Sequence, residues 1–116
     1  GLERPALFHC TAGKDRTGWA AAALLSLLGV DDDTVTQDYL RSSQPVLDSF
    51  RPVFEQFAAV GGDPEVLVPV FAVTEEYLQA ARDAVAEHYG DVEGWFRDGL
   101  GLPADVPDLL RARLLV

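Results

Sequence analysis

The sequence predicts an α/β fold in which this chain is mostly α-helical, with one strand that leads into a loop. Three observations support this prediction. A short apolar segment precedes a glycine-containing loop, apolar residues then recur at helical spacing through most of the chain, and glycine or proline separates these periodic segments. With 116 residues, of which 48% are hydrophobic, the chain is one domain or part of one.

The first elements flank the loop. Pro5 to Phe8 is predicted to be a buried strand, and residues 15–28 a helix that is apolar almost all round and therefore central and buried. Gly29 is expected to end this helix. Asp32 or Asp33 is the predicted N-cap of a short helix that runs to about Arg41.

The middle of the chain predicts a helix from Pro45 to Val60. Its aromatic and aliphatic residues at helical spacing are Leu47, Phe50, Phe54 and Phe57. This stripe has two interpretations: packing in a core, or a helical lid within residues 45–73 that covers a site.

The last third predicts helices with clear end signals. After a turn at Gly61 and Gly62, Asp63 resembles an N-cap that is followed by a proline at the first helical position. The run 66–71 is ambiguous, because its β-branched residues favour a strand whereas Pro69 argues against a central one. Residues 74–89 predict an amphipathic helix that Gly90 ends, and 91–98 and 107–115 predict two more.

Composition excludes several kinds of function. A formal net charge of −10 argues against binding to nucleic acid or to anionic membrane surfaces. The apolar run 19–28 is too short to cross a bilayer. One cysteine excludes an internal disulfide, and two histidines with one cysteine at these spacings do not predict a metal site. No cofactor is expected.

The most informative segment is His9–Gly18, HCTAGKDRTG, in which a cysteine and an arginine are separated by five residues. Five intervening residues can curl so that their N–H groups meet at one point and bind an anion. A helix that begins near Asp15 adds its free N–H groups and its dipole. Arg16 can hold two phosphate oxygens through its planar fork. The predicted phosphate-binding residues are Thr11, Ala12, Gly13, Lys14, Asp15 and Arg16.

The same donors favour a thiolate at Cys10, which makes this residue the predicted nucleophile of an enzyme that removes phosphate through a cysteinyl-phosphate intermediate. Thr17 is predicted to donate its hydroxyl to the sulfur, and His9 to orient the loop through a backbone carbonyl. Asp15 has two interpretations of equal weight: a general acid for the leaving oxygen, or a residue that favours the helix N-terminus.

The motif resembles that of the atypical bacterial tyrosine phosphatases, the family typified by mycobacterial PtpB, in which the Lys-Asp pair of the loop is distinctive. Two later stretches are similar to the same family, at 38–43 and at 76–102. The resemblance implies a three-layer α/β cysteine-phosphatase fold in the intact protein and favours a helix at 66–71. It also implies action on phosphotyrosine, with phosphoserine, phosphothreonine or phosphoinositides as further substrates. By position, Cys10 corresponds to the nucleophile, Arg16 to the phosphate clamp and Asp15 to a candidate acid.

One departure from the family is large, because only nine residues precede Cys10. We therefore expect residues 1–116 to be the C-terminal part of a single phosphatase domain, with the strand and phosphate loop at 5–18 and a helical region at 19–116. The expected partners are a phosphorylated protein or a small phosphomonoester. The expectation also includes either self-association or a missing N-terminal half, because the strand would lack its neighbours.

Two other functions are compatible with a cysteine and arginine at this spacing. Low-molecular-weight phosphatases and arsenate reductases share it, but they need several strands after the loop, and this chain offers at most one. A non-catalytic phosphate-binding or interaction fragment is the remaining alternative. A reactive thiolate functions best in a reducing compartment, which favours a cytoplasmic location.

Overall fold

The structure is a computed structural model that describes residues 4–116, and these residues form helices joined by turns and loops, with no strand among them. The prediction of a mostly helical chain is therefore confirmed. In chain order the elements are α1 (Asp15–Leu27), α2 (Asp32–Leu40), α3 (Ser43–Ser49), α4 (Arg51–Ala59), the 3-10 helix η1 (Pro64–Leu67), α5 (Val68–Phe71), α6 (Glu75–Tyr89), α7 (Val92–Gly94), the π-helical turn η2 (Trp95–Gly99) and α8 (Val106–Leu114).

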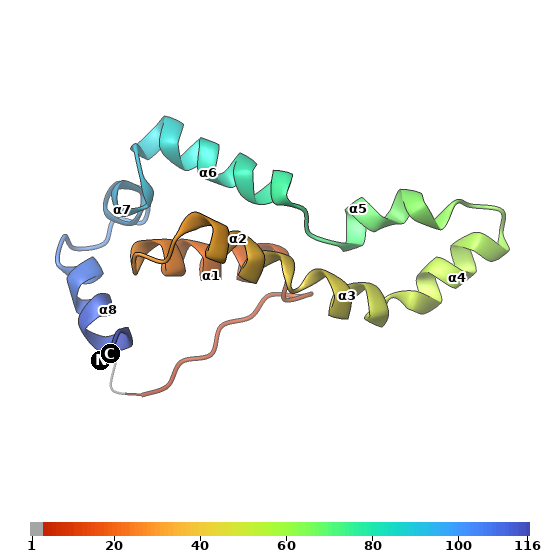
Figure 1. Ribbon diagram of the computed structural model, residues 1–116, viewed down its shortest axis with the longest axis horizontal. Coiled ribbons are helices and arrows are strands. Elements are labelled where there is room, and N and C mark those ends of the chain that lie inside the picture. Colours follow the sequence, from red (N-terminus) through yellow and green to blue (C-terminus); the bar gives the residue numbers. More distant parts are fainter. Residues whose placement is uncertain (1–3) are drawn as a thin grey trace.

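The molecule is elongated, with extents of 55 × 34 × 24 Å, and consists of two parts (Figure 1). The part that we call the body contains α1, α2, α6, α7 and α8, in which α1 packs on α2 and α7, and α2 packs on α6. The part that we call the arm, residues 43–71, is a hairpin in which α3 and α4 run out from the body and η1 and α5 return to it. The loop of the motif lies where the arm joins the body.

The core of the body forms between α1, α2 and the start of α6. Its buried residues are Ala22, Val35, Tyr39, Val73 and Leu78, with Trp19, Leu25, Val30 and Leu40 packed around them. The last glycine of the motif has a role in this packing. A Cβ on Gly18 would lie 2.9 Å from the Tyr39 ring, so a side chain there would force this ring out of its place against α1.

The predicted strand at Pro5 to Phe8 is wrong for this chain. These residues are exposed and form neither a helix nor a strand, with Leu7 91% and Phe8 51% exposed. A strand is defined by hydrogen bonds to a neighbouring strand, and no other strand occurs in residues 4–116. The apolar pattern is present, but its pairing partner is not.

Two further expectations for the first helices need correction. Helix α1 is central but is not buried all round, because its fully buried side chains are Ala22, Ala23 and Leu27, whereas Ala20 is exposed. The N-cap of α2 is Asp31, one residue before the predicted pair, and its carboxylate accepts hydrogen bonds from Thr34 N at 2.9 Å and Thr34 Oγ1 at 2.7 Å. Three aspartates in succession offered no local signal to choose between them.

The predicted helix from Pro45 to Val60 is interrupted at Phe50, where the backbone leaves helical geometry with φ −97° and ψ 9°. Pro52 explains the interruption, because it has no N–H to donate to the carbonyl four residues earlier and its ring crowds that carbonyl. The aromatic stripe packs inside the arm. The ring of Phe71 lies 4.6 Å from that of Phe50 and 5.5 Å from that of Phe54, between centroids, as expected for the packing interpretation.

The later predictions agree with the structure. Asp63 caps η1 by accepting a hydrogen bond from Glu65 N at 3.1 Å, and the ambiguous run 66–71 is helical. Helix α6 ends at Gly90, whose φ of 83° is a conformation that glycine adopts at little cost. Among residues 4–116, none of the helices combines the length and the apolar character needed to cross a bilayer.

Candidate active site

The motif forms the connection between the extended N-terminal segment and α1. Gly13 has a φ of 68°, in the left-handed region that favours glycine, so the backbone reverses there before the helix begins. Lys14 precedes the first helical turn, and Asp15 is its first residue. The first turn of α1 therefore faces the same loop that carries Cys10, and its N–H groups have no intrahelical acceptor.

Cys10 is half-buried in this loop and is activated by the donors around it. The Thr17 hydroxyl, followed by the Thr17 backbone N–H, lowers the pKa of the thiol, and the backbone N–H groups of Gly13 and Ala12 lower it further. Partial burial acts in the opposite direction, and the pKa falls to about 6. The backbone N–H groups of the loop thus favour the thiolate form of Cys10.

Thr17 has an additional property that bears on this site. Its Oγ1 is buried and has no hydrogen-bond partner of standard geometry among the described residues. The hydroxyl nevertheless gives the largest contribution to the lowered pKa of Cys10. A buried hydroxyl without a hydrogen-bond partner is unusual in a folded protein.

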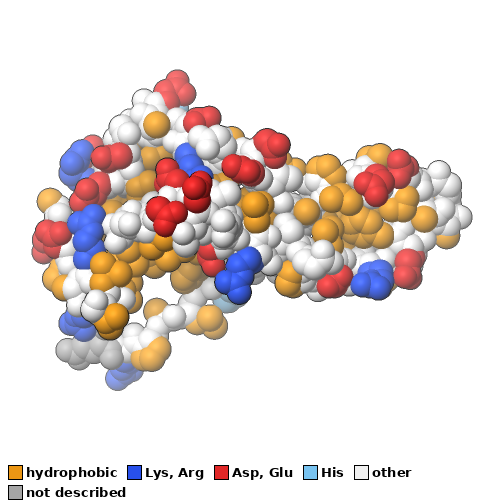
Figure 2. Space-filling model, in the orientation of Figure 1, with side chains coloured by type: hydrophobic (Ala, Val, Ile, Leu, Met, Phe, Trp, Pro, Cys, Tyr) orange, Lys and Arg blue, Asp and Glu red, His pale blue; other side chains and the backbone are white. Residues whose placement is uncertain are grey.

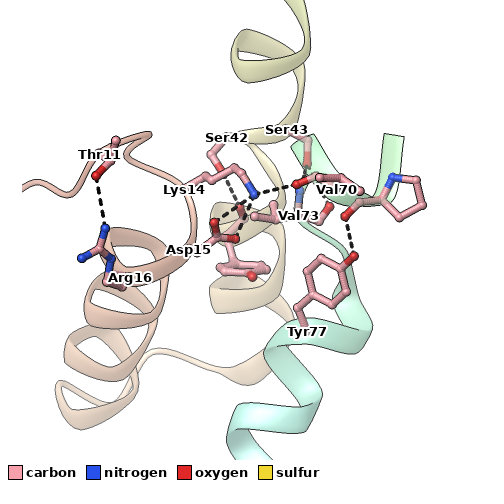
Figure 3. A network of polar contacts seen from close by, with 11 residues as sticks. Thr11, Lys14, Asp15, Arg16, Ser42, Ser43, Val70, Val73 and Tyr77 are labelled. Carbon is pink, nitrogen blue, oxygen red and sulfur yellow. Dashed lines mark hydrogen bonds and ion pairs between the residues drawn. The ribbon is translucent and has the colours of Figure 1, made fainter. Parts of the chain in front are cut away.

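Arg16 and Thr11 close the loop from the outside (Figure 3). Arg16 Nη2 donates a hydrogen bond of 3.3 Å to Thr11 Oγ1, and both residues are exposed. One guanidinium nitrogen is thus engaged by the loop itself, and the contact spans the segment that contains the N–H groups of Ala12 and Gly13.

Lys14 and Asp15 form an ion pair beside the loop. Lys14 Nζ donates to Asp15 Oδ1 at 3.0 Å and lies 2.9 Å from Asp15 Oδ2, so both carboxylate oxygens face the ammonium. Asp15 is 59% exposed in its side chain, whereas Lys14 is only 9% exposed. A proton on Asp15 would weaken this pair. This observation bears directly on the two interpretations of Asp15.

His9 lies at the exposed edge of the loop. Its ring Nδ1 is 3.4 Å from the backbone carbonyl oxygen of Cys10, so it does contact a carbonyl, although that of its own neighbour. No group of three or more histidine, cysteine or acidic side chains within residues 4–116 is arranged to hold a metal ion.

Sequence reasoning missed one participant, the carbonyl oxygen of Val70 at the end of α5. Lys14 Nζ donates a hydrogen bond to this oxygen at 3.3 Å. The two residues are far apart in the sequence, and a backbone carbonyl carries no residue-specific signal. This contact follows only from the way in which the arm folds back onto the body.

Comparison with known proteins finds a phosphatase family. The model of a family described as the tyrosine phosphatase family matches residues 1–116. A Cupriavidus necator protein named as a candidate tyrosine-protein phosphatase is 42% identical over 94 residues, which are 81% of this chain and 34% of that protein.

Two other relatives carry related names. The triple specificity protein phosphatase PtpB of Mycobacterium tuberculosis is 37% identical over 123 residues, which cover 97% of this chain and 44% of PtpB. A tyrosine-protein phosphatase of Nostoc commune is 54% identical over 37 residues, which are 32% of this chain and 13% of that protein. The chain therefore spans less than half the length of the curated relatives it matches.

Proposed function

The chain belongs to the tyrosine phosphatase family, and from this premise we propose that it takes part in hydrolysis of phosphotyrosine through a cysteinyl-phosphate intermediate. The observation that carries the proposal is the motif at 9–18, in which the donors of Thr17, Gly13 and Ala12 lower the pKa of Cys10. A thiol with a pKa of about 6 is mostly ionised near neutral pH, as a nucleophile requires. The same N–H groups suit the oxygens of a phosphoryl group.

The proposed reaction has two steps. The Cys10 thiolate attacks phosphorus, a sulfur–phosphorus bond forms, and the bond from phosphorus to the ester oxygen breaks as the tyrosine phenol leaves with a proton donated by the general acid. Water then attacks the phosphocysteine, the sulfur–phosphorus bond breaks, and inorganic phosphate and the thiolate are released. In the second step the Thr17 hydroxyl is proposed to stabilise the departing sulfur, because it is buried beside Cys10 without a standard partner.

Arg16 is proposed as the phosphate clamp. It occupies the position at which the motif places a bidentate donor, and its bond to Thr11 shows that its guanidinium lies against the loop. Thr11, Ala12, Gly13, Lys14, Asp15 and Arg16 form the proposed phosphate-binding segment. Within it, Lys14 is directed away from solvent toward Asp15 and Val70, so the backbone and Arg16 carry most of the binding.

Asp15 is proposed as the candidate acid, with a condition set by the ion pair. Because both of its oxygens face the Lys14 ammonium, the proton that it delivers has to be taken up when substrate binds. A phosphate dianion beside Asp15 repels its negative charge and favours that uptake. Without this effect, Asp15 serves only the start of α1, where an acidic side chain is favourable.

The substrate is proposed to be phosphotyrosine in a protein. Phosphoserine, phosphothreonine and phosphoinositides are the wider range to test, since one relative is named a triple specificity protein phosphatase. Their hydrolysis is measured on peptides that differ only in the phosphorylated residue, and on a phosphoinositide in detergent. Preference for the tyrosine peptide supports the narrower proposal, and equal rates support the wider one.

The experiment that tests the proposal is steady-state hydrolysis of an aryl phosphate by the chain, with Cys10→Ser as the control. We expect turnover that is lost in Cys10→Ser, while binding of phosphate ester persists, and loss of both in Arg16→Ala. The alternative is a non-catalytic phosphate-binding module, which the exposed segment 5–8 favours. Binding of phosphate without turnover by the chain itself would identify that alternative, and turnover by Cys10→Ser would refute the covalent mechanism.

The three-layer α/β fold of the family belongs to the same proposal. The chain would form the C-terminal part of one domain, in which residues 5–8 become a strand when neighbouring strands are present. Leu7 and Phe8 are exposed, and Figure 2 shows further hydrophobic side chains on the surface over α4 and α5. We propose that the chain covers such surface by self-association or by an N-terminal half. Sedimentation equilibrium tests this, and a clean monomer of the chain's own mass at high concentration would refute self-association.

A further inference from the structure

Lys14 is the only lysine of the chain, and it is the one charged residue that is buried among residues 4–116, with 7% of its surface exposed. Burial of an ammonium group is costly unless hydrogen bonds and an opposite charge replace its water. Lys14 Nζ has both: the Asp15 carboxylate on one side and the Val70 carbonyl oxygen, at 3.3 Å, on the other. The side chain therefore joins the loop to the end of the arm.

The far side of this contact is a short segment, residues 69–73, that we call the joint, where α5 ends and the chain turns into α6 (Figure 3). The Tyr77 hydroxyl donates to the carbonyl of Pro69. Ser43 Oγ donates to Val73 O at 2.9 Å and accepts from Val73 N at 3.1 Å. Side chains from the first turns of α3 and α6 thus bind the joint on either side of Val70.

The joint is also anchored by packing. Val73 is 4% exposed and belongs to the core of the body, together with Tyr39 and Leu78. The carbonyl that Lys14 binds is therefore held at a fixed place relative to the body, by polar contacts on one side and by core packing on the other. A tether to a fixed point restricts the loop more than a tether to a mobile segment would.

We propose that Lys14 is a positioning residue that holds the phosphate loop in its donor-converging shape by tethering it to the joint, so that the state of the joint controls the loop. Lys14 directly follows Ala12 and Gly13, whose backbone N–H groups help to lower the pKa of Cys10. Release of the tether lets this part of the backbone turn away, and the sulfur loses two of its donors. The inference rests on the proposed function, because the shape of the loop matters only if the loop binds phosphate. The reactivity of the Cys10 thiol tests the inference without any turnover.

The experiment follows the pH dependence of Cys10 alkylation by iodoacetamide in the 116-residue chain. Lys14→Met keeps the length of the side chain but removes its charge and its donors. Ser43→Ala combined with Tyr77→Phe loosens the joint without altering any loop residue. Thr36→Val is the matched control, because it removes a comparable contact between α2 and α6, the bond from Arg82 Nη1 to Thr36 Oγ1 at 2.9 Å.

We expect the midpoint of alkylation, near pH 6 in the unaltered chain, to move toward the ordinary value of a free thiol, roughly 8.5, in Lys14→Met and in the Ser43/Tyr77 variant, but not in Thr36→Val. Circular dichroism checks that each variant is folded. If Lys14→Met does not fold, the comparison of the joint variant with Thr36→Val decides.

Three outcomes would overturn the proposal. The first is a folded Lys14→Met with an unchanged midpoint. The second is an unchanged midpoint in the joint variant, which would show that the joint does not control the loop. The third is an equal displacement in Thr36→Val, which would indicate general loosening of the fold. Failure of the proposed function is different, because the chain would then not hydrolyse an aryl phosphate even though its thiol titrates near pH 6.

Discussion

The activation of Cys10 gives a prediction that can be worked out from the structure. Thr17→Val removes the hydroxyl that contributes most to the lowered pKa of the thiol and replaces it with a group of nearly the same shape. The hydroxyl is buried and has no standard hydrogen-bond partner, so the substitution breaks no other bond of normal geometry. We therefore expect the pKa of Cys10 to rise above 6, although not fully to the value of a free thiol, because the backbone donors of Thr17, Gly13 and Ala12 remain.

The size of the pKa shift at Cys10 determines which quantity to measure. With a pKa of about 6 the thiol is about 90 per cent ionised at pH 7, whereas a free thiol of pKa ~8.5 is about 3 per cent ionised. This is a difference of about thirtyfold in thiolate. However, a thiolate of lower pKa is intrinsically less nucleophilic, with a Brønsted slope of about 0.4–0.5, which removes roughly tenfold of that advantage. The rate at one pH is therefore a weak test, and the midpoint of the pH profile is a strong one.

The assay is alkylation by iodoacetamide, a neutral reagent, followed across about pH 4.5 to 10 under conditions in which the chain stays folded. We expect a midpoint near 6 for the unaltered chain and a higher one for Thr17→Val. Thr36→Val, which makes the same chemical change on α2, serves as the control and should leave the midpoint in place. A midpoint near 8.5 in the unaltered chain, or an unchanged one in folded Thr17→Val, would refute the reasoning.

Three other predictions follow from the structure. The pKa of Cys10 is lower in the folded than in the unfolded chain, so the thiolate stabilises the fold fully above the unfolded value of ~8.5 and loses this effect as pH falls toward 6. In urea titrations, the free energy of unfolding of the unaltered chain should therefore exceed that of Cys10→Ser by more at pH 9 than at pH 5.5. If Asp15 is the acid, Asp15→Asn should slow phenyl phosphate far more than an ester of an acidic phenol, and equal losses would assign Asp15 to loop structure. Arg111→Met removes two hydrogen bonds, of 3.1 and 2.9 Å, to the carbonyl of Leu27 at the end of α1, together with the ion pairs of Arg111 to Asp108 and Glu93. It should lower the free energy of unfolding by about 1.5 to 3 kcal/mol, and no change would show that these contacts of α8 do not stabilise the body.

Most of the helical framework was predictable because its signals are local. Asp63 followed by Pro64 marks the start of η1, and Gly90 marks the end of α6, since each of these residue types favours the backbone conformation required at its position. The loop was predictable for the same reason. The donors that act on Cys10 lie within residues 12–17, so the motif contains nearly all of its own geometry.

The missed features depend on contacts between distant residues or on competing local signals. Phe50, Phe54 and Phe57 continue one helical stripe, but Pro52 interrupts the helix that carries them, and the stripe then packs on Phe71 from a later element. The partner of Lys14 could not be found from sequence, because any backbone carbonyl could have accepted its hydrogen bond. Burial of this lysine was equally unpredictable, since lysine is almost always exposed.

At the segment Pro5 to Phe8, the local sequence pattern and the contacts between distant residues lead to different structures. Its apolar pattern is that of a buried strand, yet the residues are exposed, because a strand exists only as a member of a pair. The helical side of the site has no such requirement, because Thr17 lies on α1 and Gly13 lies at the turn before it, and both lower the pKa of Cys10 without a neighbouring strand. Activation of the thiol therefore depends on the loop and the start of α1, whose signals are local in the sequence, and not on the pairing of residues 5–8 with another strand.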